Sequence, residues 1–198
     1  MGDVKSKTFL DTNASSATYV AAAAQPTSTF TLANSSFGTN TARKITATTA
    51  GTGDNGKTVT IVGKDHNNED ATEVITLTGS AETSSGTTTA FLSITSATVS
   101  AQPAANVSLG MTADVFGSVF QGRTRVRQVN AESGGSIGSV LFRDGSLTGT
   151  ALLTVRTGGT AGDINTVNIP QDGILYKDGA FVTFDETQCN SATVYFDG

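Results

Sequence analysis

A two-residue alternation of apolar and hydroxyl side chains constrains the fold of this chain more than any other feature of its sequence. Val59 and Ile61 alternate with threonines, and Gly63 ends the run long before a helix could form. Similar short runs recur along the chain, separated by stretches rich in Gly, Asn and Asp, which tolerate tight turns. The sequence therefore predicts an all-β fold of antiparallel strands joined by turns.

The segment that leads into this run carries the strongest apparent sign of catalysis. Residues 51–58 read GTGDNGKT and match the phosphate-binding pattern GxxxxGKT at every fixed position. A working phosphate loop opens a helix, because the helix N-terminus and the loop N–H groups hold the phosphates together. Here residues 44–49 before the loop and residues 58–62 at its end both have the pattern of strands. We therefore interpret the segment as a hairpin loop and expect no nucleotide site.

A second apparent nucleotide motif lies near the end of the sequence. Residues 181–186 read FVTFDE and resemble the hydrophobic strand ending in Asp-Glu that holds magnesium in phosphate-loop enzymes. The preceding Asp178-Gly179 turn predicts a β-hairpin over residues 173–184 instead. A phosphate-loop fold needs parallel strands joined by helices, so this motif also fails on its context.

The expected strands fall into two groups, which indicates two small antiparallel β-sandwich or barrel domains preceded by an extended N-terminal arm. Residues 1–29 form the arm, residues 30–112 a β-sandwich, residues 113–122 a docked linker, and residues 123–198 a second all-β domain. The expected strands cover residues 30–32, 43–49, 57–62, 73–78, 89–99 and 106–111 in the first domain and residues 123–129, 138–142, 151–156, 165–169, 174–176, 181–184 and 192–196 in the second.

The predicted arm is polar and has few apolar anchors. These anchors are Phe9, Leu10, Tyr19 and Val20. Such a segment cannot bury enough apolar surface alone, so it is either mobile or an arm that orders against a neighbour, and we expect the arm. The alanines at 21–24 allow one helical turn at most.

Metal and catalytic chemistry find little support in the sequence. Residues 63–71 join two alternating strands, but a calcium loop needs Gly at its sixth position and a bidentate Glu at its twelfth, where this chain has Asp70 and Thr76. We predict a solvated hairpin tip. His66, the only histidine, has no second histidine with which to share a metal or a catalytic triad. We expect no catalytic residue, no metal and no cofactor.

Charge and cysteine content narrow the possible partners. The net charge of −5 argues against a protein that coats nucleic acid, which needs a basic face. Cys189, the single cysteine, cannot form an internal disulfide and is interpreted as a small buried hydrophobe. No apolar run approaches the roughly 18 residues that span a bilayer, and residues 1–24 lack the apolar centre of a signal peptide. We therefore expect synthesis in a cytoplasm, with no membrane or nucleic-acid partner.

Arg123, Arg125 and Arg127 form the only concentrated charge in the sequence. They alternate with Thr124, Val126 and Gln128, so a strand would place all three guanidinium groups on one face. This face can bind carboxylates of a neighbouring subunit or, less favourably, phosphate. It can equally be a solvated face that pairs with nearby acidic residues of its own chain.

The sequence patterns resemble modules of virion structural proteins from tailed bacteriophages. In the first domain the resemblance lies in ITATTAGTGDNGKTVTIVGKD, ATEVITLTG and FLSITSATVSAQPAANVSLG, and in the second it lies in GSVLFRDGSLTGTALLTVRT, VNIPQDGILYKDGAFVTF and ATVYFDG. It covers most of residues 45–198, and its motifs are combinations of strands and turns. Residues 1–29 match nothing in these modules.

The resemblance implies a structural role without catalysis. The first expectation is a capsid decoration or cement protein that binds the outside of the head after synthesis in the bacterial cytoplasm. Its partners would be the major capsid protein or other virion subunits, and it would form a homo-oligomer such as a trimer or hexamer. The alternative is a neck, tail or fibre component, with possible contact to a host-surface glycan. A free carbohydrate-binding module is disfavoured because the chain has no Trp for sugar stacking.

Overall fold

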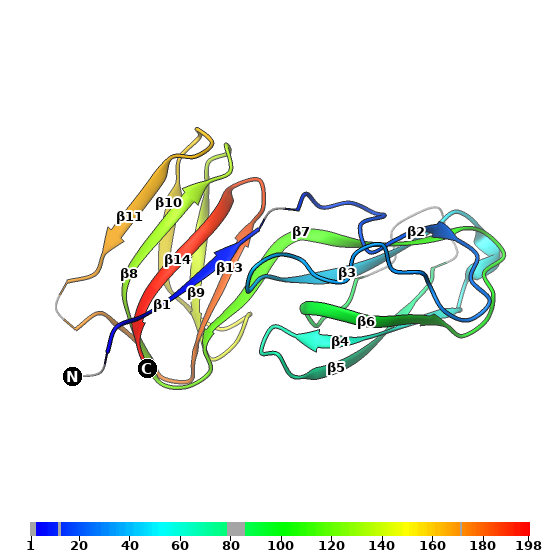
Figure 1. Ribbon diagram of the computed structural model, residues 1–198, viewed down its shortest axis with the longest axis horizontal. Coiled ribbons are helices and arrows are strands. Elements are labelled where there is room, and N and C mark those ends of the chain that lie inside the picture. The colour runs from blue at the N-terminus through cyan, green and yellow to red at the C-terminus, as the bar shows by residue number, and fades with distance from the viewer. Residues whose placement is uncertain (1–2, 12, 79–85, 171) are drawn as a thin grey trace. The chain divides into compact units, whose positions relative to one another are not determined.

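The computed structural model describes residues 3–11, 13–78, 86–170 and 172–198. These residues contain strands and one 3₁₀ turn (Thr52–Asp54) but no α-helix, which confirms the predicted all-β class (Figure 1). The strands are β1 (Lys5–Leu10), β2 (Ala21–Ala24), β3 (Ala42–Thr49), β4 (Thr58–Asp65), β5 (Asp70–Thr76), β6 (Phe91–Val99), β7 (Val107–Phe120), β8 (Thr124–Ser133), β9 (Gly138–Asp144), β10 (Ala151–Thr157), β11 (Ile164–Asn168), β12 (Ile174–Tyr176), β13 (Ala180–Asp185) and β14 (Cys189–Asp197).

The chain divides into two compact units whose boundaries differ from the predicted domains. Unit 1 combines Met1–Asn13, Gly38–Thr41 and Ala113–Gly198, and unit 2 combines Ala14–Phe37 and Ala42–Thr112. Each unit is therefore assembled from segments that are separate in sequence.

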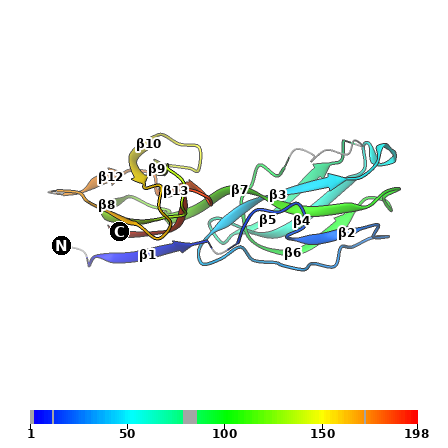
Figure 2. The same ribbon diagram turned by 90° about the horizontal axis from the view of Figure 1, so that it is seen from above.

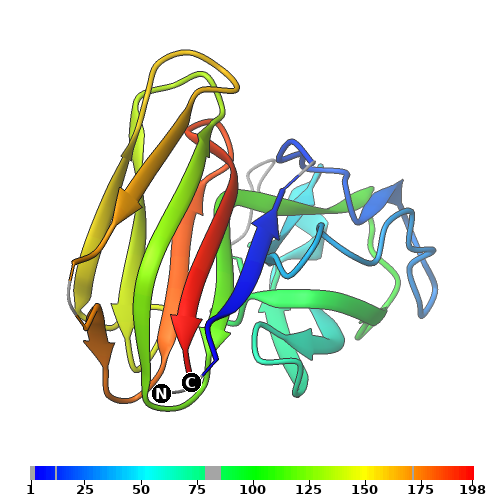
Figure 3. The same ribbon diagram turned by 60° about the vertical axis from the view of Figure 1, so that its left-hand side comes forward.

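Unit 1 consists of two antiparallel sheets that enclose one apolar core. One sheet has the order β1-β14-β8-β11, with β12 also paired to β8 (Figure 3). The other has the order β10-β9-β13 and continues onto the part of β7 that begins at Ala113. Apolar side chains from both sheets meet between them, among them Phe9, Val129, Phe142, Val182 and Val194.

Unit 2 contains the sheet order β3-β6-β4-β5, with β3 next to the first part of β7 (Figure 1), and Figure 2 shows the same strands from above. On the other side of β7, strand β2 pairs at Ala21 and Ala24 with a register irregularity between them. Residues 28–36 lie along β6 through isolated bridges, such as Thr29↔Thr98, so the expected strand at 30–32 does not form as a regular strand. The core includes Phe30, Phe37, Ile45, Ile61, Phe91 and Leu109.

The predicted linker at residues 113–122 lies mostly within β7, which runs without interruption to Phe120. Val115, Gly117 and Val119 in this segment are buried in unit 1. Asp114 and Gly117 resemble turn residues in the sequence. In the structure, the Phe9 ring packs against the backbone of Gly117 and leaves no room for a side chain at this position.

The predicted N-terminal arm is also divided between the two units. Strand β1 pairs with β14 over its whole length, and Phe9 is fully buried in the core of unit 1. Val20 is fully buried in the core of unit 2, and Ala21–Ala24 forms a strand instead of a helical turn. These segments satisfy their backbone groups and bury their apolar side chains within the chain, so a neighbouring subunit is not needed to order them.

Two predicted hairpins connect strands that are not paired. The loop at residues 51–56 joins β3 and β4, as expected, but β6 lies between these strands in the sheet. Residues 173–184 contain β12 and β13, which belong to different sheets. The hairpin at residues 63–71 is confirmed, since β4 and β5 are paired neighbours.

Candidate interaction surface

The GTGDNGKT segment forms a buried polar network in unit 2. The carboxylate of Asp54 is fully buried and accepts hydrogen bonds from Lys57 Nζ at 2.9 Å and from the backbone N–H of Ala104 at 2.6 Å. Further hydrogen bonds come from Thr49 Oγ1 at 3.1 Å and from the Ala105 N–H at 3.2 Å. The Lys57 ammonium also donates to the carbonyl of Gln102 at 2.8 Å.

This network joins the loop tightly to residues 102–105. A Cβ placed on Gly51 would lie 2.8 Å from the Cβ of Ala105, and one on Gly53 would lie 2.9 Å from the Cβ of Ala104. Glycine permits this close approach of the two loops. The lysine that a phosphate loop would direct at its ligand is therefore bound to groups of its own chain.

The three arginines of the predicted stripe lie in unit 1 at or beside β8, on the face opposite to Thr124 and Val126, which are buried. Arg127 pairs with Asp197 on β14, where its Nε donates to Oδ2 at 2.7 Å. This arginine is therefore engaged within the chain, as the solvated-face alternative predicted.

Arg123 and Arg125 differ from Arg127 because neither has an ion pair to a carboxylate among the residues that the structure describes. Arg125 Nη1 donates only a long hydrogen bond, 3.3 Å, to the carbonyl of Asp172. Both arginines line an open hollow of about 220 Å³, together with Thr124, Leu175, Asp197 and Gly198. The two guanidinium groups, with Leu175 beside them, can bind a further carboxylate through paired hydrogen bonds. We call this hollow the arginine site.

The other predicted interface residues are placed differently. Phe9 and Val20 lie inside the cores, so neither side chain is exposed for a partner. The Tyr19 hydroxyl donates to the carbonyl of Ser36 at 3.1 Å, and its ring lies 5.9 Å from that of Phe37. Leu10 remains 37% exposed.

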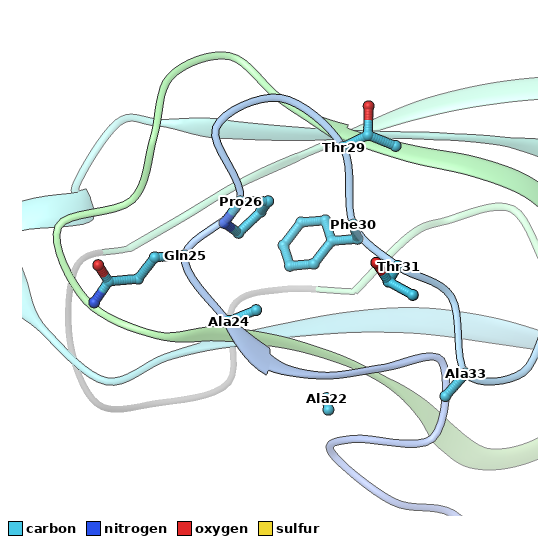
Figure 4. Close-up of a pocket in the computed structure, with 8 residues that line it drawn as sticks. All are labelled: Ala22, Ala24, Gln25, Pro26, Thr29, Phe30, Thr31 and Ala33. Atoms are coloured by element: carbon cyan, nitrogen blue, oxygen red, sulfur yellow. The ribbon is translucent and has the colours of Figure 1, made fainter.

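A larger hollow of about 390 Å³ lies in unit 2 and was not expected from the sequence. It is lined by Ala22, Ala24, Gln25, Pro26, Thr29, Phe30, Thr31 and Ala33. The Phe30 ring points toward Pro26 and Ala24 (Figure 4). Phe30 itself is only 4% exposed, and no charged residue lines the hollow. Alanines and threonines give no sequence signal for a binding site, which is why the pattern did not reveal it.

The hairpin tip that contains His66 shows no metal geometry. Burial lowers the pKa of the His66 imidazole, although the carboxylates of Asp65 and Glu69 act in the opposite direction. Asp65 Oδ1 accepts from the N–H groups of Asn67 and Glu69, at 2.8 and 3.0 Å, and so closes the turn. Across the described ranges, no group of three or more His, Cys, Asp or Glu residues is placed to hold a metal ion.

Comparison of the chain with protein-family models, with curated proteins and with solved structures gives no match. In the described part of the chain, no helix is long and apolar enough to cross a membrane.

Proposed function

We propose that this protein is a structural component of a tailed-bacteriophage virion, a decoration protein that binds the outside of the head. The sequence patterns of residues 45–198 support this role through their resemblance to virion modules. The structural observation that supports it is the arginine site, where neither the exposed Arg123 nor the half-buried Arg125 forms an ion pair with a carboxylate of the described residues, and where Asp197 is paired with Arg127. Such a site suits recognition of another protein.

The partner would be the major capsid protein, and its contribution would be an exposed Asp or Glu side chain. A carboxylate can accept two parallel hydrogen bonds from one guanidinium group, which fixes its orientation as well as its position. Leu175 in the wall of the site would contact the apolar part of the entering side chain. Weak contacts of this kind become effective on a capsid, because a lattice offers many copies and an oligomer of this protein could bind several at once.

The polar network around Asp54 supports a structural role over a catalytic one. In phosphate-loop enzymes the lysine of the motif contacts the nucleotide phosphates. In this chain Lys57 bonds to Asp54 and Gln102, and so stabilises a connection between strands.

Quantitative mass spectrometry of particles purified from the phage that encodes the chain tests this function. We expect hundreds of copies in each particle. A dozen copies or fewer would assign the protein to the neck or tail, and its absence from particles would overturn the virion role.

Binding of purified protein to heads that lack it tests the arginine site. We expect the double variant Arg123→Ala/Arg125→Ala to lose about tenfold or more in affinity, while remaining folded. Arg156→Ala removes an exposed arginine from β10 and serves as the matched control. Equal binding of the double variant and the wild type would exclude the arginine site as the docking surface.

A further inference from the structure

We propose that two copies of this chain associate edge to edge through strand β11 of unit 1, with the two β11 strands antiparallel. This inference does not depend on the virion role, since it concerns only the contact between copies.

Strand β11 ends its sheet, and the backbone groups of three of its residues point away from β8. The hydrogen bonds Ile169 N–H to Arg127 O, at 2.9 Å, and Ser133 N–H to Asp163 O, at 2.8 Å, show that odd-numbered positions of this segment face β8. Because the direction alternates along a strand, the N–H and C=O groups of Ile164, Thr166 and Asn168 point outward. All three of these residues are exposed.

The neighbouring edge of the opposite sheet does not occupy these groups through any hydrogen bond in the described residues. The contact that joins the two edges is made by the side chain of Asn165, whose Nδ2 donates to the carbonyl of Arg156 on β10 at 2.7 Å. This hydrogen bond uses a side chain of β11 and leaves its outward backbone groups without a partner from β10. The outward backbone groups of β11 therefore remain a template for another strand.

Strand β11 also lacks the features that protect sheet edges. Natural edge strands carry charges or irregularities that discourage pairing with another chain. Charges are present on the other long edge strands: Lys5 and Lys7 on β1, Asp70 and Glu73 on β5, and Arg156 on β10. Strand β2 has a register irregularity instead. Strand β12 is also an uncharged edge beside β8, but it has only three residues, and Tyr176 among them is buried. The sequence of β11, INTVN, contains no charge and no proline, and its pairing with β8 is regular.

A second copy of the chain fits this edge by symmetry. A twofold axis at Thr166 places Thr166 opposite its counterpart and Ile164 opposite Asn168 of the other copy. Each of these facing pairs can exchange two hydrogen bonds, because all three positions point outward. Each copy carries a net charge of −5. Because β11 has no charged side chain, pairing the two β11 strands places no like charges opposite each other. The Ile164 side chain is 68% exposed in a single copy, and the second copy would bury part of it.

Disulfide trapping of Thr166→Cys tests the register. Facing residues of a hydrogen-bonded pair have Cα atoms about 5.5 Å apart, which lies within the range that a disulfide can bridge. We expect Thr166→Cys to form a covalent dimer under mild oxidation. Ile164→Cys, whose counterpart would not face it, should remain monomeric under the same conditions. The native Cys189 is fully buried and does not compete.

Sedimentation equilibrium of Thr166→Lys tests the contact without a cross-link. The substitution puts two like charges opposite each other at the axis, so we expect the Kd of the dimer to rise about tenfold or more. Thr8→Lys adds the same charge in the same row of the sheet, on the edge strand β1, and should leave the Kd unchanged. Circular dichroism would verify that both variants fold.

Three results would overturn the proposal. The first is a wild-type protein that stays monomeric at all accessible concentrations. The second is a dimer that Thr166→Lys and Thr8→Lys weaken equally. The third is a failure of Thr166→Cys to cross-link while the wild type dimerises, which would exclude this register and this edge.

Discussion

The ammonium group of Lys57 lies 2.9 Å from the carboxylate of Asp54, a side chain with no exposed surface. Burial alone would raise the pKa of this carboxyl, but hydrogen bonds from Lys57, Ala104, Ala105 and Thr49 outweigh it, and the pKa is lowered from its ordinary value. The ionised carboxylate is thus the state that the fold stabilises.

Lys57→Ala should destabilise the protein without affecting any nucleotide binding. The substitution removes the partner of a buried charge, and we expect the free energy of unfolding to fall by about 3 kcal/mol. Lys64→Ala is the matched control, because Lys64 pairs with the exposed Asp70. We expect this substitution to lower the free energy of unfolding by about 0.5 kcal/mol or less. Urea denaturation measures both values. Calorimetric ATP binding that is present in the wild type and lost in Lys57→Ala would contradict our interpretation.

The stability of the wild type should fall in acid in a way that depends on Asp54. A carboxyl with a lowered folded-state pKa contributes fully above its unfolded value, near 3.8, and this contribution disappears as the pH falls through the folded-state pKa. Asp54→Asn should be less stable at neutral pH, but it should lose less stability on acidification below about pH 4. Denaturation curves measured across this range test the difference. Parallel pH profiles for the two proteins would show that Asp54 does not contribute.

Gly117→Ala should destabilise unit 1 through a clash with Phe9. A Cβ at position 117 would overlap Cε1 and Cδ1 of the Phe9 ring, and the backbone φ at this position is not in the left-handed region. We expect a loss of about 2 kcal/mol, which is typical of overpacking. The double variant Gly117→Ala/Phe9→Leu should lose less than the sum of its single changes, as thermal denaturation would measure. If the losses of the two single variants add strictly in the double variant, the clash between position 117 and the Phe9 ring is excluded.

Tyr176→Phe should raise the stability of the protein. The Tyr176 side chain is fully buried, and its hydroxyl has no hydrogen-bond partner among the described residues. Burial, with a smaller contribution from Asp144, raises the pKa of this phenol above its ordinary value. Removing the unsatisfied hydroxyl should increase the free energy of unfolding by about 1 kcal/mol. Tyr195→Phe on β14, where the ring is half-buried, is the control. A lower Tm for Tyr176→Phe would reveal a bound water or another partner at the hydroxyl.

Most regular strands were predictable from the sequence because their signals are local. The alternation in β3, β4 and β6 and the turns that follow strands depend only on neighbouring residues. Strands β1 and β2 were missed, since each is defined by a partner strand distant in sequence. The second part of β7 was mistaken for a linker because Gly117, which accommodates a ring, looks like a turn residue.

The arginine site was predictable only in part. The spacing of the three arginines correctly predicted a shared face of β8. The pairing of Arg127 with Asp197, which leaves Arg123 and Arg125 as the open pair, depends on how β8 and β14 align, and sequence spacing carries no information about that register.

The pairing of β1 with β14 imposes an order on folding during synthesis. Lys5 stands opposite Phe196, so the sheet that buries Phe9 cannot be completed until β14 has left the ribosome. All of the residues of unit 2 emerge earlier, and contacts that close over shorter separations form faster. We therefore expect ribosome-bound chains that end near residue 150 to protect unit 2, but not β1, against protease. Strand β1 would then wait without a partner strand until the roughly 180 residues that separate it from β14 have been made.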